Sequence, residues 1–187
     1  MSTYLILVRG INVGGRNKVS MTALKRCLEE LGFSNVLTYI NSGNVILQSD
    51  RSARDVRFLI EGTLPKAFKL DSETIKALVL SLPQLQAVIT SKPTGFGDQP
   101  DKYRNDAIFL IGIDAVTAMS VFNPNDGIDK VWQGNGVIYF QRLDALRTKS
   151  HLGAIVGTST YKCMTIRTWG TTTKLLELMK KVANEEG

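Results

Sequence analysis

Residues 9–18 have the sequence Arg9-Gly10-Ile11-Asn12-Val13-Gly14-Gly15-Arg16-Asn17-Lys18. This glycine-rich, basic loop follows the apolar run Tyr4–Val8, which is typical of a buried strand, and precedes an amphipathic helix that begins after Ser20. Glycine permits positive φ and close approach to the backbone, and the basic and amide side chains supply donors. Exposed N–H groups beside cations and a helix start can hold an anion. We therefore expect ligand contacts from Arg9, Asn12, Gly14, Gly15, Asn17 and Lys18.

A helix and a hairpin are expected after this loop. Apolar residues between 24 and 31 recur at helical spacing, and Gly32 is typical of a helix end. Two strands, Val36–Ile40 and Val45–Gln48, are then joined by Asn41-Ser42-Gly43-Asn44. Glycine within such a short polar connection favours a β-hairpin.

A second helix and a fourth strand complete the pattern of the first half. Ser52 and Asp55 are spaced to cap the start of a helix, which Pro65 is expected to kink or end. Residues 74–80 form another apolar run. The resulting order, β-α-β-β-α-β, predicts an α+β fold in which a ferredoxin-like sheet of four strands carries two helices on one face.

This topology predicts a neighbour for the glycine-rich loop. The first two strands run in the same direction, so the loop and the turn at residues 41–44 should lie at the same edge of the sheet. We therefore add Ser42 and Asn44 to the expected ligand contacts. The same four residues would also make a good turn with no further role.

The second half of the chain indicates a related unit. A helix is expected from residue 81 to before Pro93, and residues 92–105 are rich in glycine, proline and aspartate, as linkers are. Residues 107–140 then show a β-α-β-β pattern similar to that of the first half. We expect a ferredoxin-like subdomain at 1–80, a helix and linker at 81–105, and a second α+β subdomain at 106–187 packed on the first.

Two stretches of the chain carry positive charge without any acid. Residues 1–28 hold five lysines and arginines, residues 145–176 hold five more, and neither stretch contains aspartate or glutamate. Solvated surface is the usual place of such side chains. If the stretches meet, they form a surface that attracts phosphate or nucleic acid. In the later stretch we expect a short helix at residues 148–156 and a last helix that Arg167–Lys174 enters. Lys149, Arg167 and Lys174 are therefore further expected ligand contacts.

Several function classes find no support in the sequence. No apolar run is long enough to span a membrane, and the N-terminus lacks the features of a secretory signal, so we expect a cytoplasmic protein. Cys27 and Cys163 are isolated, His151 is the single histidine, and no metal-ligand spacing is visible. The glycine-rich loop matches neither nucleotide-binding glycine motif, and no nucleophile elbow occurs. Catalytic residues and cofactors stay unknown.

The chain resembles a known family at the motifs described above. Residues 9–18, then Met21 with Leu24, and Tyr39-x-x-Ser42-Gly43-Asn44-Val45 closely resemble the opening of domain-of-unknown-function family 1697. Thr148-Lys149 and Arg167-x-Trp169-x-Thr171-x-x-Lys174-Leu175 are similar to its C-terminal signature. The chain departs from the family beside the tryptophan, where Thr168 and Gly170 replace frequent asparagines. The resemblance implies a soluble bacterial protein and supplies no established activity.

Three functions fit these observations. The leading hypothesis is a binding module for a phosphorylated ligand, nucleotide or nucleic acid. The second is an enzyme acting on a phosphorylated small molecule, with Arg9, Lys18, Arg167 and Lys174 as electrostatic clamps. The third is an oligomeric structural or interaction protein whose loops only pack. The oligomeric state is left open by the sequence.

Overall fold

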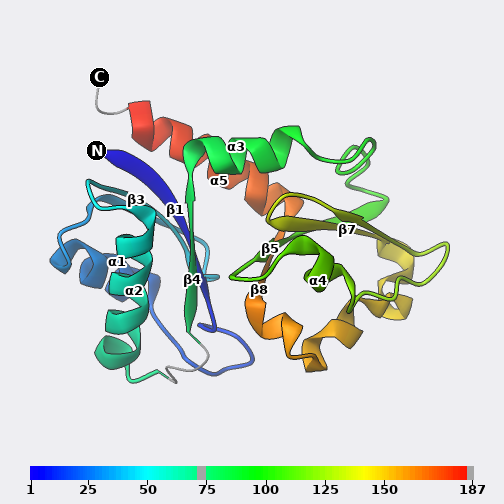
Figure 1. Cartoon of the computed structure of the whole chain (residues 1–187), viewed down its shortest axis with the longest axis horizontal. Helices are drawn as coiled ribbons and strands as arrows, with labels where there is room; N and C mark the ends of the chain where they lie inside the picture. Colours follow the sequence, from blue (N-terminus) through cyan, green and yellow to red (C-terminus); the bar gives the residue numbers. More distant parts are fainter. Residues whose placement is uncertain (71–74, 185–187) are drawn as a thin grey trace. The chain divides into compact units, whose positions relative to one another are not determined.

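The chain folds into two compact units (Figure 1), and the computed structural model describes residues 1–70 and 75–184. Unit 1 comprises Met1–Gln86 and Lys174–Gly187, and unit 2 comprises Ala87–Thr173. The chain passes from unit 1 to unit 2 within helix α3 (Leu82–Thr90) and returns within helix α5 (Trp169–Asn184). Within the described residues, no helix combines the length and apolar character that a membrane crossing requires.

Unit 1 contains a four-stranded antiparallel sheet. Its strands are β1 (Ser2–Arg9), β2 (Ser34–Tyr39), β3 (Asn44–Ser49) and β4 (Lys76–Ser81), in the order β2-β3-β1-β4. Residues Tyr4–Val8 of β1 are all buried, which explains why an unbroken apolar run becomes a central strand. The predicted ferredoxin-like arrangement is therefore confirmed. The first residue of the predicted fourth strand, Thr74, lies outside the described residues.

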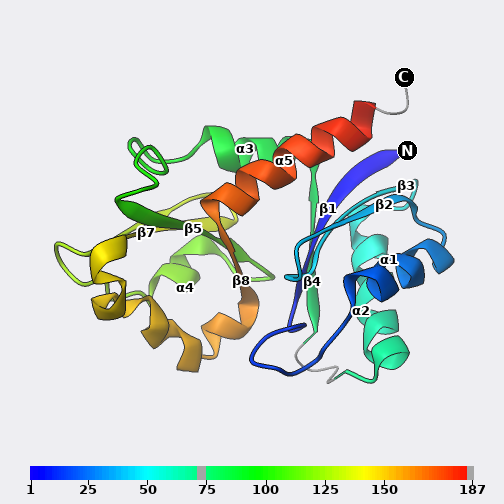
Figure 2. The same ribbon diagram turned by 180° about the vertical axis from the view of Figure 1, so that it is seen from behind.

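Helices cover both faces of this sheet. Helices α1 (Met21–Glu30) and α2 (Ala53–Phe68) lie on one face, where their apolar stripes pack against alternate residues of β1 and β3 (Figure 2). Leu5 and Ile46 pair on the opposite face and are fully buried. Gln48, two residues after Ile46, approaches the carbonyl of Val182 in α5 with its Nε2 at 3.5 Å. The C-terminal part of α5 therefore completes unit 1.

The second helix begins as predicted but does not end at its proline. The Ser52 hydroxyl accepts a hydrogen bond from the Asp55 N–H at 3.2 Å and donates one to its carboxylate at 2.6 Å. Pro65 does not end the helix, because α2 continues to Phe68 and ends where Lys69 adopts a φ of 53°. Pro65 is buried, and its carbonyl accepts a hydrogen bond from the Leu70 N–H at 2.9 Å. Its packing and this hydrogen bond offset the cost of the helical hydrogen bond that proline, which has no N–H, cannot donate.

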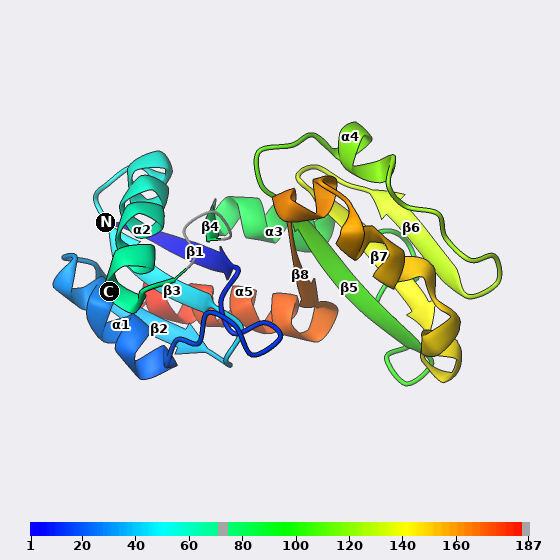
Figure 3. The same ribbon diagram turned by 90° about the horizontal axis from the view of Figure 1, so that it is seen from below.

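Unit 2 repeats the sheet order of unit 1. Its strands are β5 (Tyr103–Leu110), β6 (Asp129–Gln133), β7 (Val137–Leu143) and β8 (Met164–Thr168), in the order β6-β7-β5-β8. Helix α4 (Ala115–Met119) and the short 3-10 helices η1 (Asp144–Lys149), η2 (His151–Gly157) and η3 (Thr160–Cys163) connect them, with η1 to η3 running beside the sheet (Figure 3). The expected α+β fold with two similar subdomains is confirmed.

Two expectations for the C-terminal third are corrected. The single helix expected at residues 148–156 is replaced by parts of η1 and η2, which Ser150 separates. Arg167 does not lie at a helix entrance, because it belongs to β8, which pairs with β5. This strand was not predicted, and it gives the second sheet its fourth member.

Candidate functional site

The glycine-rich loop of unit 1 is a small hairpin with a tight turn at its tip. The Arg16 N–H donates to the Val13 carbonyl at 3.0 Å, and Gly14 and Gly15 between them have φ values of 57° and 76°. Two successive residues with positive φ are the signature of a type I′ turn, which strongly favours glycine. Beyond their own chain neighbours, no atom lies within 4 Å of where either glycine's Cβ would be. The backbone at the tip is therefore open.

The side chain of Asn12 connects this loop to the rest of unit 1 by hydrogen bonds. Its Oδ1 accepts from the Val19 N–H at 2.8 Å, while its Nδ2 donates to the carbonyls of Val19 at 2.9 Å and Asn41 at 3.1 Å. Asn12 also has a φ of 55°, which asparagine tolerates better than most residues. Both N–H groups of its amide are engaged, so the donor that we expected Asn12 to offer a ligand holds the loop instead.

Asn17 has a comparable role on the other side of the loop. Its φ is 47°, its Nδ2 donates to the Gly10 carbonyl at 2.8 Å, and its own carbonyl accepts from the Asn12 N–H at 3.1 Å. Asn12 and Asn17 together fix the shape of the loop from within.

The β2–β3 turn lies against the loop, as the topology predicted. The Val8 N–H donates to the Gly43 carbonyl at 2.8 Å, in addition to the bond between Asn12 and Asn41. Gly43 is required here, since its φ is 71° and a Cβ would lie 2.7 Å from the Val8 carbonyl oxygen. Ser42 is exposed, whereas Asn44 is buried and donates to the Tyr39 carbonyl at 3.1 Å. Of the two predicted contacts, Ser42 is at the surface and Asn44 is inside the hairpin.

The loop places basic side chains around the open tip. Arg16 and Lys18 are exposed, and within the described residues neither forms an ion pair. Arg9 is half-buried at the end of β1, where it pairs in register with Lys76 of β4.

The remaining predicted cations differ in their surroundings. Lys149 is exposed in η1 of unit 2. Arg167 is buried, its Nη1 donates to the Thr165 hydroxyl at 2.9 Å and the Ile166 carbonyl at 2.8 Å, and burial lowers its pKa to about 10. In unit 1, Lys174 Nζ lies 2.6 Å from Glu177 Oε1. This ion pair offsets the unfavourable interaction between a cation and the start of a helix. Their joint action with the glycine-rich loop stays a prediction.

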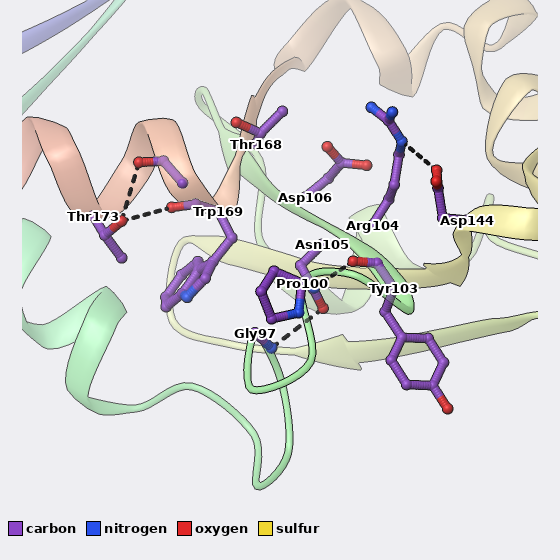
Figure 4. A pocket seen from close by; sticks show the side chains of 11 residues that line it. Gly97, Pro100, Tyr103, Arg104, Asn105, Asp106, Asp144, Thr168, Trp169 and Thr173 are labelled. Atoms are coloured by element: carbon purple, nitrogen blue, oxygen red, sulfur yellow. Dashed lines mark hydrogen bonds and ion pairs between the residues drawn. The ribbon is translucent and has the colours of Figure 1, made fainter.

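Unit 2 contains a cavity of about 520 Å³ beside the start of α5. Residues before β5, the first part of β5, Asp144 and the first turn of α5 surround it (Figure 4). The lining residues are Gly97, Pro100, Tyr103, Arg104, Asn105, Asp106, Asp144, Thr168, Trp169, Gly170 and Thr173. This volume is in the range of sites that bind small molecules.

Asp106 is the buried acid of this cavity. Its side chain lies between Thr168 and Arg104 (Figure 4), and its Oδ2 is 3.2 Å from Arg142 Nη2 but accepts no hydrogen bond from any described residue. Burial raises the pKa of the Asp106 carboxyl, while Arg142 and Arg104 act in the opposite direction. The ion pair with Arg142 therefore compensates part of the cost of burying this carboxylate.

An ion pair at the rim and aromatic packing on the apolar side hold the walls of the cavity. At the rim, Arg104 Nε and Asp144 Oδ1 are 2.6 Å apart, and the guanidinium lowers the pKa of the Asp144 carboxyl. On the apolar side, Trp169 packs edge-on against Phe96 with ring centroids 5.1 Å apart. Gly97 is essential to this packing, since a Cβ there would lie 2.6 Å from the indole ring.

Sequence reasoning did not find this cavity. Asp106 immediately precedes the apolar run that we expected to form a strand, and Arg104 and Asp144 are far apart in the chain. The one available signal was the carboxylate itself, since an acid next to a buried strand is rarely placed there for solubility. Within the described residues, no cluster of three histidine, cysteine, aspartate or glutamate side chains is arranged to hold a metal ion.

Comparison with known proteins gives a family and a structural neighbour. The model of a family described as protein of unknown function (DUF1697) matches residues 1–139, which confirms the resemblance found in the sequence. The chain is also similar to the solved structure of the conserved bacterial protein SP0830 from Streptococcus pneumoniae. The two share 28% identity with a TM-score of 0.76, over 95% of this chain and 98% of that chain. No curated protein matches.

Proposed function

This chain belongs to the DUF1697 family of proteins of unknown function, and we propose that it is a binding module for nucleic acid. The phosphate backbone is held by the glycine-rich loop at residues 9–18. The observation that carries this proposal is the pair of exposed cations, Arg16 and Lys18, beside an open type I′ turn. A cytoplasmic location, where nucleic acids are accessible, accords with this function.

The form of the loop favours an extended ligand over a small one. Small molecules bind in concave sites that cover most of their surface, whereas Gly14 and Gly15 at this tip have open space around them. A nucleic acid presents a continuous row of phosphates, which arginine and lysine neutralise with release of counterions. The fixed shape of the loop reduces the entropy that is lost when it binds, because Asn12 and Asn17 already order it.

Binding to short fluorescent oligonucleotides, single-stranded and duplex, tests this function by anisotropy across a series of salt concentrations. We expect log affinity to fall linearly with log salt, by about 0.9 for each duplex phosphate neutralised. Arg16→Ala and Lys18→Ala should each weaken binding to all sequences and reduce the slope by about 1.

Lys66→Ala is the matched control, since Lys66 is an exposed lysine of the same unit on helix α2. It should leave both affinity and slope unchanged. Equal losses in all three variants would indicate only a net-charge effect. Absence of binding at low salt, or binding that ignores salt, would overturn the proposal.

A further inference from the structure

Two apolar side chains of unit 1 are exposed beside the cations of the glycine-rich loop. Val13, in the loop, is 64% exposed, and Ile40, in the β2–β3 turn, is 48% exposed. Each is the chain neighbour of a partner in the hydrogen bond that joins the two segments, from Asn12 Nδ2 to the Asn41 carbonyl at 3.1 Å. Phosphate binding uses the cations of this surface and gives these two apolar side chains no role.

Val13 lies directly opposite Arg16 across the small hairpin of the loop. The two residues form an antiparallel bridge, and residues paired in this way project on the same face, with Cβ atoms about 5 Å apart. Arg16 is itself exposed. A phosphate bound by its guanidinium therefore brings the rest of the nucleotide close to an apolar side chain.

Ile40 has a backbone conformation that its side chain disfavours. Its φ is 49°, which is an outlier for a β-branched residue, whereas asparagine adopts such values much more readily. Almost half of the residue is exposed, so burial in the core does not explain why an isoleucine occupies this position. Backbone strain of this kind is concentrated at functional sites, where contact with a ligand accounts for it.

Apolar side chains beside cations that bind phosphate favour contact with bases. The faces of bases are stacked inside an intact duplex, and an aliphatic wedge such as isoleucine reaches them by opening a base step. Proteins that bind single strands use mainly aromatic rings, and neither residues 9–18 nor residues 40–43 contain one. Opening a step costs less where the bases are mismatched. The surface therefore fits a duplex whose stacking is already weakened.

We propose that the glycine-rich loop binds duplex nucleic acid at mismatched steps, with Val13 and Ile40 against the opened bases and Arg16 and Lys18 on the flanking phosphates. This inference rests on the proposed function and names its substrate. An anionic membrane fits the same surface less well. Amphipathic segments enter a membrane with a continuous apolar helix face, whereas these two aliphatic side chains belong to separate turns.

Two labelled DNA duplexes that differ only in a central T·T mismatch test this proposal by anisotropy. We expect the native protein to bind the mismatched duplex about tenfold more tightly, because its bases are easier to unstack. A 2-aminopurine beside the mismatch should become more fluorescent on binding, since unstacking removes its quenching. Equal affinity for the two duplexes would overturn this inference and leave the proposed function intact, whereas no binding to either duplex would overturn both.

Ile40→Asn separates contact with bases from contact with phosphates. It should reduce the preference for the mismatched duplex to about twofold or less and leave the salt slope unchanged, because the cations are still present. Its urea midpoint should be no lower than that of the native chain, since asparagine accepts the positive φ. Arg16→Ala should do the opposite, with a slope reduced by about 1 and the preference for the mismatch retained.

Val13→Ser keeps the test decisive if the Ile40 variant does not fold, because Val13 is largely exposed. It should also reduce the preference for the mismatched duplex. Val116→Ser makes the same chemical change in α4 of unit 2, at a residue that is 70% exposed, and it should leave both affinities unchanged. The proposal is overturned if a folded Ile40→Asn or Val13→Ser variant keeps the native preference, or if the protein binds vesicles of anionic phospholipid but neither duplex.

Discussion

Asn12 combines a left-handed backbone with three hydrogen bonds from one side chain. Asn12→Ala should therefore lower the free energy of unfolding by about 2–4 kcal/mol, from the lost bonds and from an alanine held at positive φ. Asn12→Gly removes the bonds but permits the φ, so its loss should be smaller. Urea denaturation of the three proteins measures both terms. Equal midpoints for Asn12→Ala and the native chain would mean that the loop holds its shape without this amide.

Gly14 tests whether the turn itself is needed for binding. Its φ of 57° is accessible to asparagine but costs alanine about 1–2 kcal/mol. We therefore expect Gly14→Asn to keep both the urea midpoint and oligonucleotide affinity, and Gly14→Ala to lower both. Because the φ is positive, a loss of function in Gly14→Ala alone would not separate ligand contact from folding. A Gly14→Asn variant that folds normally but no longer binds would identify this position as a direct contact.

Asp106 should give the protein a recognisable dependence on pH. Its folded pKa is raised by burial above the ordinary carboxyl value, so the folded chain binds this proton more tightly than the unfolded chain does. The resulting stabilisation is fully present below the ordinary carboxyl pKa, and it is lost as pH rises through the raised value. The free energy of unfolding of the native chain, minus that of Asp106→Asn, should increase as pH falls from about 7 toward about 4.

Urea denaturation at a series of pH values measures this difference. Subtracting the variant cancels the acids whose pKa values are lowered, such as Asp114 and Asp144. A difference that is flat with pH would mean that Asp106 stays ionised as readily in the fold as in the unfolded chain.

The sequence identified the glycine-rich loop but not the structural roles of its individual side chains. A pair of glycines between basic residues is a local signal, and the observed turn at Gly14 and Gly15 accords with it. The role of Asn12 depends on Asn41, a residue 29 positions away, and no local pattern reveals such a partner. Asp106 was missed for the same reason, since its charged neighbour Arg142 belongs to another strand.

Among the elements, β8 shows why one strand was missed while the others were found. Strands β1, β3 and β5 contain apolar runs or follow turn residues, which is the pattern that predicts a strand. Strand β8 has the sequence Met-Thr-Ile-Arg-Thr, with one face that carries Thr165 and Arg167. Both are buried, and they satisfy each other by a hydrogen bond of 2.9 Å. Because the buried face of β8 is polar, the strand lacks the apolar pattern that predicts a strand. Its hydrophobicity alone does not distinguish it from a loop.

Helices α1 and α2 allow opposite predictions for stability. Leu28 of α1 is 1% exposed within the core of unit 1, so Leu28→Ala should cost about 2–5 kcal/mol by opening a cavity. Gly62 of α2 is exposed, with open space around it and a φ that alanine can adopt, so Gly62→Ala should add about 0.5–1 kcal/mol. Denaturant midpoints check both. A neutral Leu28→Ala would contradict the packing of α1 on the sheet.

For the whole molecule, the sheet order was accessible from the sequence because both units share it. The β-α-β-β pattern that recurs along the chain accounts for three strands in each sheet, β2-β3-β1 and β6-β7-β5, whereas β8 was not predicted. The sequence did not predict that the C-terminal part of α5 belongs to unit 1, because α5 lies at the far end of the chain. Amphipathic spacing reports that a helix has an apolar face, and it does not report which sheet that face covers.

Lys18 and Lys149 belong to different units and test whether both bind the same nucleic acid. If one bound duplex contacts both side chains, Lys18→Ala and Lys149→Ala should each reduce the salt slope by about 1, and the double variant by about 2. Anisotropy over a salt series provides the slopes, with Lys66→Ala as control. If Lys149→Ala leaves the slope unchanged, the ligand contacts unit 1 without this lysine.

Unit 1 contains both the first and the last described residues, and this has a consequence for synthesis at the ribosome. Domains made first usually fold first, but here the face that carries Leu5 and Ile46 lacks α5 until the whole of unit 2 has been translated. Unit 2, which is one continuous segment, can complete its sheet earlier. The nascent chain therefore presents an uncovered apolar sheet for most of its translation, which is the kind of surface that chaperones bind, and its N-terminal half is the last to become native.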